Sequence, residues 1–320
     1  MITLKKALRE AKKNKVAIGH FNISEFVTLK ACWEAAQELS RYNVITLNVK
    51  TQIPLIIGVS EGEQKFIGTT EAVDLIKHIR KNHNYPIFLN ADHHKTVESC
   101  KAAIDAGFDS VIIDAADLSF EENVKITREV VEYARASKNK KVLIEGELGF
   151  IGSGSMVRDK LPDGVQITED TITKADEAAK FVQETGVDLL APAIGNVHGM
   201  FSSSVIASGT PRGNPSPSSE PAYVKHLFIK RIKEIRRAAK VPLVLHGGSG
   251  TPDEDFVKAI EAGVQIIHIS TELRRAWRGG MEKALVANPT EVAPYKLLES
   301  SLEGVKAVAL ARLKLFNHIA

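Results

Sequence analysis

Histidines and carboxylates stand directly after short apolar runs in this sequence, where they could do chemistry together. Five of the ten histidines lie at such points, namely His93, His94, His198, His246 and His268. A single histidine in such a place is usually a hydrogen-bonded core residue. Three neutral imidazoles from separate strands, with one coordination position left open, are what a catalytic Zn²⁺ needs. The spacing therefore predicts a metal site held by His93, His198 and His246.

Three carboxylates accompany these histidines: Asp92, Asp114 and Glu147. Asp92 precedes His93, and neighbouring residues of a strand point to opposite faces, so both reach one site only where the strand turns into its loop. There, Asp92 either braces a metal ligand or exchanges a proton with a substrate. Asp114 and Glu147 either support a second cation or a hydrogen-bond network, or form ordinary salt bridges.

A glycine-rich segment, residues 246–250, reads His-Gly-Gly-Ser-Gly and precedes a predicted helix that begins near Pro252. Glycines let backbone N–H groups approach an anion closely, and a helix N-terminus favours negative charge. Ser270 and Thr271 follow the next apolar run. Because barrels commonly bind phosphate between their last two such loops, we favour a phosphate site here over a plain tight turn.

The elements that must position these residues are short apolar runs alternating with amphipathic segments. Several of the runs are unbroken, which is typical of parallel strands buried on both faces. Eight runs with helices between them predict a closed (β/α)8 TIM barrel, with one additional C-terminal helix over 293–320; an open, doubly wound sheet is the alternative. The eight runs are 16–23, 44–49, 86–91, 110–115, 141–148, 188–195, 242–247 and 265–270.

Composition excludes several other classes of protein. The chain has 320 residues, 44% hydrophobic and 25% charged, which fits one globular domain over 1–320. Lys and Arg exceed Asp and Glu by only 42 − 39 = 3, so nothing favours a nucleic-acid or membrane partner. No run approaches the ~20 apolar residues of a membrane span, and no signal core follows Met1, so we expect a cytoplasmic protein. Residues 202–221, rich in Ser, Pro and Gly, are predicted to be a mobile insertion.

Taken in order, these residues resemble the class II, zinc-dependent fructose-bisphosphate and tagatose-bisphosphate aldolases over roughly residues 4–285. Each motif alone is weak, but together they are highly specific. The motifs are Gly19-His20-Phe21-Asn22, Asp92-His93, Phe120-Glu121-Glu122-Asn123, and the segments 145–149, 193–199, 246–250 and 269–273.

The resemblance implies an aldolase that cleaves a ketose (bis)phosphate, such as fructose or tagatose 1,6-bisphosphate, to dihydroxyacetone phosphate and an aldehyde such as glyceraldehyde 3-phosphate. Zn²⁺ on His93, His198 and His246 would polarise the ketone carbonyl and stabilise the enediolate. Asp92 matches the catalytic carboxylate that exchanges a proton with the hydroxyl formed from the aldehyde. Members usually assemble as dimers or tetramers, so we expect a homodimer or homotetramer.

The resemblance also implies where the substrate's phosphates lie. A monovalent cation, Na⁺ or K⁺, is expected to attend the ketose 1-phosphate. Arg274 would meet the distal phosphate, and Glu147 a displaced or second metal. The residues expected around the 1-phosphate are Gly199, Gly247, Gly248, Ser249, His268, Ser270 and Thr271.

The sequence departs from the family's pattern around this site. Asn90 stands where the family usually has histidine, His94 where a small residue is usual, and His268 where asparagine is usual. Ser270 replaces the aspartate of fructose-preferring members, which favours either the tagatose-like branch or a different aldehyde.

The largest departure is the loop after the fifth strand, which normally carries one or two acids that move the substrate's C–H proton. Here residues 152–155 read Gly-Ser-Gly-Ser. Either another group, Asp159 or His94, takes that proton, or the reaction differs. The alternatives are a zinc and phosphate barrel with other aldol or isomerase chemistry, and a catalytically silent metabolite-binding protein.

Overall fold

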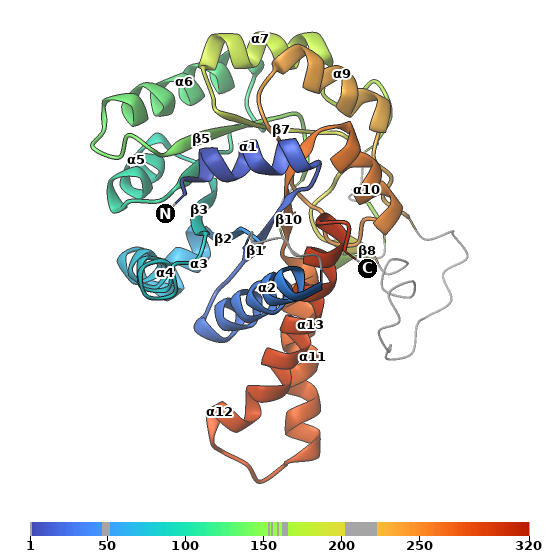
Figure 1. Cartoon of the computed structure of the whole chain (residues 1–320). Coiled ribbons are helices and arrows are strands. Elements are labelled where there is room, and N and C mark those ends of the chain that lie inside the picture. The colour runs from blue at the N-terminus through green and yellow to red at the C-terminus, as the bar shows by residue number, and fades with distance from the viewer. Residues whose placement is uncertain are drawn as a thin grey trace.

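The computed structural model describes residues 2–46, 52–152, 154, 156–158, 160–161, 166–201 and 223–319. In this part of the chain eight parallel strands close into a barrel in the order β1-β10-β9-β7-β5-β4-β3-β2 (Figure 1). Closure confirms the predicted TIM barrel and excludes the open sheet. The barrel strands are β1 Ile18–Asn22, β2 Leu55–Ser60, β3 Ile87–His94, β4 Ser110–Ile113, β5 Leu143–Leu148, β7 Leu189–Pro192, β9 Leu243–Leu245 and β10 Val264–Ile269.

Helices surround the barrel, and a small two-stranded parallel sheet lies outside it. The two short strands are β6 Val157–Arg158 and β8 Met200–Phe201. The helices are α1 Leu4–Asn14, α2 Phe26–Thr46, α3 Glu61–Ile67, α4 Thr69–His83, α5 Val97–Ala106, α6 Phe120–Ala136, α7 Ala175–Thr185, α9 Ile229–Ala239, α10 Asp253–Ala262, α11 Thr271–Ala287, α12 Pro294–Leu297 and α13 Glu299–Phe316.

Helix α1 closes the amino-terminal end of the barrel. Its buried residues Leu4, Ala7, Leu8 and Ala11 follow the spacing of one helix face and form a single cluster with interior residues such as Phe88. Several of these partners lie at or near the first residues of their strands. Figure 1 shows α1 lying across the barrel opening. The carboxyl ends of the strands, which carry the candidate site residues, are therefore the end open to a ligand.

The prediction of a second strand at 44–49 was wrong. Residues 44–46 continue helix α2, and residues 47–49 lie outside the described residues. The second strand is β2, which pairs in parallel with both β1 and β3. A run of β-branched residues suggested a strand, but such propensity is weak, and α2 is a long helix whose earlier turns are anchored in the core by Leu29 and Leu39.

The C-terminal segment packs against its own barrel, but as two helices and not one. Pro294 begins the four-residue α12, and α13 follows from Glu299. Helix α13 lies beside α11 and α2 (Figure 1), with Val305 buried and Phe316 packed against Phe256 of α10. Across the described ranges no helix is long and apolar enough to cross a membrane. The predicted insertion at 202–221 lies outside the described residues.

Candidate active site

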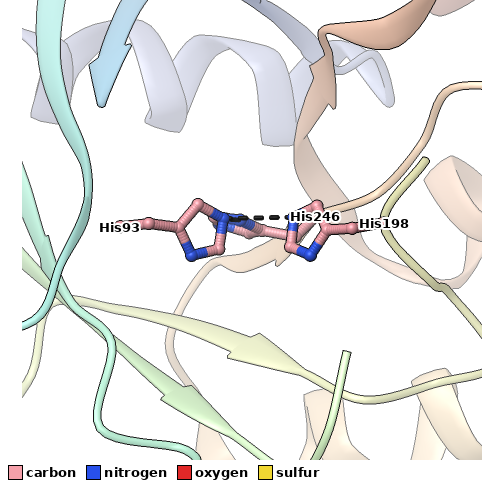
Figure 2. A group of neighbouring side chains, drawn as sticks. All are labelled: His93, His198 and His246. Atoms are coloured by element: carbon pink, nitrogen blue, oxygen red, sulfur yellow. Dashed lines mark hydrogen bonds between the residues drawn. The ribbon is translucent and has the colours of Figure 1, made fainter. Parts of the chain in front are cut away.

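Three histidines from three different strand ends converge at the carboxyl end of the barrel. His93 Nε2 lies 3.1 Å from His198 Nε2 and 2.9 Å from His246 Nδ1. Figure 2 shows the three imidazoles turned toward one another. His93 is the penultimate residue of β3, and the other two follow β7 and β9. The structure thus brings together the three residues that the sequence predicts as metal ligands.

The outward nitrogen of each imidazole has a partner of its own. His93 Nδ1 meets Asp114 Oδ2 at 2.8 Å, and His198 Nδ1 donates to the Gly152 carbonyl at 2.8 Å. His246 Nε2 lies 2.8 Å from Glu145 Oε1, with both side chains buried. Acceptors on the outer nitrogens hold the ring orientations and favour tautomers whose inner nitrogens carry lone pairs. That is the donor set of a divalent metal with imidazole ligands.

Backbone geometry explains how Asp92 and His93 both reach the site. His93 has φ = 49°, a left-handed conformation that is uncommon for a residue other than glycine. The register between β3 and β4 also shifts between Ala91 and His94. This irregularity breaks the alternation of the strand, so His93 Nε2 lies 4.0 Å from Asp92 Oδ1. The turn of the strand that the sequence required is present.

Negative charge surrounds the histidine cluster. His93 Nδ1 lies 3.6 Å from Glu147 Oε2, and Lys95 pairs with Asp114 at 2.8 Å. Burial alone would lower the pKa of His93, but the three surrounding carboxylates outweigh it and raise that pKa to about 10. Burial and the charge of His93 lower the pKa of His198 to about 3. The site therefore favours one positive charge at its centre, where a metal cation would sit.

The carboxylates around this centre differ in charge state. Burial raises the pKa of Glu147 to about 8 against the opposing effect of His93. For Asp114, burial is outweighed by the hydrogen bond and charge of His93, which help lower its pKa to about 2. Burial also opposes ionisation of Asp92, but His93 and His268 hold its pKa well below the usual range. Asp92 is thus a carboxylate in position to accept a proton.

Asp92 is held from one side only. Asn22 Nδ2 donates to its Oδ2 at 2.8 Å. Its Oδ1 lies 3.4 Å from His268 Nδ1 and makes no hydrogen bond within the described part of the chain, although it is buried. Glu147 Oε2 is likewise buried without a hydrogen-bond partner there. Two unsatisfied carboxylate oxygens beside three imidazole nitrogens fit a site built for a cation and a polar substrate.

Comparison with known proteins assigns the family. The sequence model described as "Fructose-bisphosphate aldolase class-II" matches residues 2–319. The chain belongs to the class II fructose-bisphosphate aldolase family. It is accordingly an enzyme of the lyase class. A fructose-bisphosphate aldolase of Geobacillus stearothermophilus is 34% identical over 320 residues, covering 99% of this chain and 97% of the relative. The same identity and coverage hold for a fructose-bisphosphate aldolase of Staphylococcus aureus.

Solved structures of class II aldolases share the fold. The crystal structure of the YdjI aldolase from Escherichia coli K12 matches with a TM-score of 0.74 at 27% identity, covering 99% of this chain and 97% of that one. A putative fructose-1,6-bisphosphate aldolase from Coccidioides immitis matches with a TM-score of 0.72 at 27% identity, covering 98% and 95%. The likeness therefore extends over the whole barrel in both.

The residues expected around the 1-phosphate lie together in this aldolase, in the loops after β7 and β9 and from the end of β10 into the start of α11. Ser249 Oγ accepts from the backbone N–H of Ser270 at 3.2 Å and of Glu272 at 3.3 Å, which ties the β9 loop to the start of α11. Gly248 N–H donates to the His268 carbonyl at 3.1 Å. Thr271 is buried as the first residue of α11. The N–H group of Gly248 thus already has a protein partner.

Two other predicted residues are engaged elsewhere in the fold. Arg274 pairs with Glu63 at 2.6 Å, although its side chain is 45% exposed. His94 Nε2 accepts from Gln64 Nε2 at 2.6 Å and belongs to none of the possible metal-binding groups among the described residues. Asp159 lies outside the described residues. His94, one of the two candidates to replace the missing loop acid, is therefore hydrogen-bonded to a residue of helix α3.

The departures at Asn90 and His268 both contact the ring of His20, and His268 lies beside Asp92. His20 Nε2 donates to Asn90 Oδ1 at 3.0 Å, and Asn90 donates to Ser110. The rings of His20 and His268 lie face to face, with centroids 3.4 Å apart, because residues 20 and 268 are level on paired strands. Burial lowers the pKa of His20 and brings that of His268 to about 3. Both are neutral imidazoles at neutral pH.

Sequence reasoning missed several residues that support the site. Glu145 orients His246, and Glu63 meets both Asn22 and Arg274. The alternation in Glu145-Gly146-Glu147 could have revealed the first, since residues two apart on a strand share a face. Lys225 precedes α9, which begins at Ile229, and is fully buried beside the β7 and β9 loops. The sequence signal that could have indicated its burial is the largely apolar run around it, Tyr-Val-Lys-His-Leu-Phe.

Proposed function

We propose that this enzyme is a zinc-dependent aldolase that cleaves a ketose 1,6-bisphosphate to dihydroxyacetone phosphate and glyceraldehyde 3-phosphate. The observation that carries the proposal is the convergence of three oriented imidazoles beside an ionised Asp92, one oxygen of which accepts no hydrogen bond from the described residues. The names of the 34% identical relatives support a bisphosphate substrate. Such a substrate needs a cation at its ketone and an anion site at its phosphate, and the barrel offers candidates for both.

The reaction requires that the hydroxyl beside the scissile bond lose a proton. Asp92 Oδ1 would accept it, while the hydrogen bond from Asn22 to Oδ2 fixes the carboxylate. The hydroxyl oxygen then forms the aldehyde carbonyl, the C–C bond breaks, and its electron pair passes to the dihydroxyacetone half, which later takes up a proton. Zn²⁺ held by His93, His198 and His246 would supply Lewis-acid polarisation of the ketone carbonyl. Glu147 and Asp114 would balance the charge of that cation.

The phosphate end would be formed by Gly199, Gly247, Gly248, Ser249, His268, Ser270 and Thr271. The start of α11, a helix of 17 residues, contributes the positive end of its dipole there. Arg274 would reach the distal phosphate from the same helix while keeping Glu63 as its partner. These assignments make the three last loops of the barrel the part that recognises the sugar phosphate.

A coupled assay for dihydroxyacetone phosphate release tests this function. It compares fructose and tagatose 1,6-bisphosphate, with and without added Zn²⁺. We expect zinc-dependent turnover, and we expect Ser270→Asp to shift the ratio of kcat/KM values toward fructose by about tenfold, the size of one changed pocket contact. Absence of turnover with both sugars, in protein shown to carry zinc, would contradict the proposal and favour other chemistry on the same scaffold.

We propose further that copies assemble as a homodimer or homotetramer in the cytoplasm. In Figure 1, α11 and α13 extend beyond the barrel, with α12 at the far end. Val286, Val292 and Tyr295 at this tip are 83%, 85% and 75% exposed, which is unusual for large apolar side chains. Light scattering is expected to give two or four chains per particle, and Val286→Asp with Tyr295→Asp to lower that number. A monomeric parent protein would overturn this expectation.

A further inference from the structure

Lys225 occupies a position that no part of the proposed chemistry explains. Its side chain is fully buried, and its ammonium donates three hydrogen bonds to backbone carbonyls. The acceptors are Gly199 at 2.5 Å, Gly247 at 2.9 Å and Ser249 at 2.6 Å. All three belong to the loops proposed to hold the 1-phosphate. Lys225 thus joins the loop after β7 to the loop after β9.

The backbone is shaped to present these carbonyls. Gly199 and Gly247 have φ values of +89° and +60°, in the left-handed region that other residues rarely adopt. A Cβ at Gly247 would lie 2.7 Å from the Val197 carbonyl oxygen, and one at Gly199 would lie 2.5 Å from that of Met156. Only glycine fits either place. Carbonyl oxygens that converge on one point form a cation site, because their dipoles all aim negative charge at it.

Burial lowers the pKa of Lys225 to about 7, whereas its three carbonyl partners favour the protonated amine. Three carbonyl acceptors require three N–H donors, which only the protonated amine provides. For the same reason no lone pair is left for imine formation, so Lys225 is not a Schiff-base nucleophile. Within the described ranges no carboxylate forms a direct ion pair with it; Glu272 acts on it only through longer-range attraction, and the ring of Phe201 lies 5.8 Å away. A buried charge without a counterion is costly, so an anion that approaches these loops is favoured.

We propose that the Lys225 ammonium is a built-in monovalent cation for the phosphate end of the site. It takes the place that a free Na⁺ or K⁺ would hold among these carbonyls, fixes the two loops, and supplies the positive charge that a substrate phosphate meets. The enzyme consequently needs no monovalent cation for activity. This inference rests on the proposed sugar-phosphate substrate for its functional part, but the cation cage itself can be tested without substrate.

A matched pair of substitutions tests the cage. Lys225→Ala opens a space that a small cation can enter, whereas Lys225→Met fills most of it with uncharged atoms. In choline chloride both variants are expected to lose about 10²-fold in kcat/KM, comparable to removal of one preorganised charge-stabilising group. Added NH₄⁺ or K⁺ is expected to raise the kcat/KM of the Ala variant at least tenfold, because either ion resembles the lost ammonium in charge and size. The kcat/KM of the Met variant is expected to stay unchanged. Lys230→Ala, an exposed lysine on α9, serves as the control.

The salt dependence of the parent enzyme is a second test that needs no variant. Its kcat/KM is expected to agree within about twofold among choline, Na⁺ and K⁺ chlorides at equal ionic strength, since the lysine already fills the cage. A requirement for Na⁺ or K⁺ in the parent enzyme would overturn the inference. So would equal rescue of the Ala and Met variants.

Melting temperatures separate this inference from the proposed function. Without substrate, NH₄⁺ or K⁺ is expected to raise the melting temperature of Lys225→Ala relative to choline, and to leave the parent and Lys225→Met unchanged. If neither sugar bisphosphate is cleaved but this shift is present, the proposed function fails and the cation cage stands. If cleavage occurs but the Ala variant shows neither shift nor rescue, the cage is wrong and the function stands.

Discussion

Metal removal is expected to lower the rate of ketose bisphosphate cleavage by about 10³-fold or more, since Lewis-acid stabilisation contributes several kcal/mol and each 1.36 kcal/mol is a factor of ten. His93, His198 and His246 aim three nitrogens at one point while hydrogen bonds to their outer nitrogens hold the rings. The measurement is dihydroxyacetone phosphate release after chelation and dialysis, followed by titration with Zn²⁺.

Restoration by one equivalent of Zn²⁺ per chain would assign the metal. Two substitutions, one at the ligand His246 and one at its partner Glu145, separate the binding of the metal from the orientation of the ligand. His246→Ala removes a ligand, so neither bound zinc nor activity is expected to return. Glu145→Gln keeps an oxygen acceptor for His246 Nε2 but replaces the carboxyl group that orients the ring, so we expect zinc affinity to fall about 10–100-fold, with activity largely recovered at saturating zinc. His78→Ala, at an exposed histidine on α4, is expected to change neither quantity. Full turnover in metal-free protein would exclude the metal role.

The sequence predicts the barrel because its signals are local. A strand such as β4 is an unbroken β-branched run, and α5 over Val97–Ala106 follows the apolar spacing of a helix. Because strand ends of a barrel meet at one rim, histidines that follow separate strands are predicted to converge, and they do. The prediction of a strand at 44–49 was wrong for the same reason. Val44-Ile45-Thr46 carries a local strand signal, but these residues continue helix α2.

Long-range pairings had no such signal. Arg274 and Glu63 are 211 positions apart, and nothing near either residue indicates that they meet. The hydrogen bonds of Lys225 likewise depend on three carbonyl groups, whose directions are set by the backbone of two other loops. From the sequence, Asp92 and His93 could be expected to reach one site only if the strand turned there. That turn could not be predicted, because the left-handed conformation of His93 is set by its packing and not by its residue type.

Asp92→Asn is expected to lower kcat by about 10²–10⁴-fold, the usual contribution of a positioned acid–base group. Asparagine has nearly the same shape and can still contact Asn22, but it cannot accept the hydroxyl proton. Steady-state cleavage of the better sugar bisphosphate measures kcat and KM, and zinc content is measured on the same samples. We expect KM to change little, because Asp92 lies beside the metal ligands and not among the loops proposed to hold phosphate.

Zinc affinity in this variant separates the two roles that the sequence left open. A brace for His93 acts through the metal, so its loss would weaken zinc binding and excess Zn²⁺ would restore the rate. A proton acceptor acts on the substrate, so its loss would leave zinc binding intact and excess Zn²⁺ would restore nothing. The geometry favours the second role, because Asp114 already accepts from His93 Nδ1 at 2.8 Å whereas Asp92 Oδ1 lies 4.0 Å from Nε2. Asn22→Ala, which releases Oδ2 but keeps the carboxylate, is expected to cost only about tenfold, the loss of one hydrogen bond to a charged group.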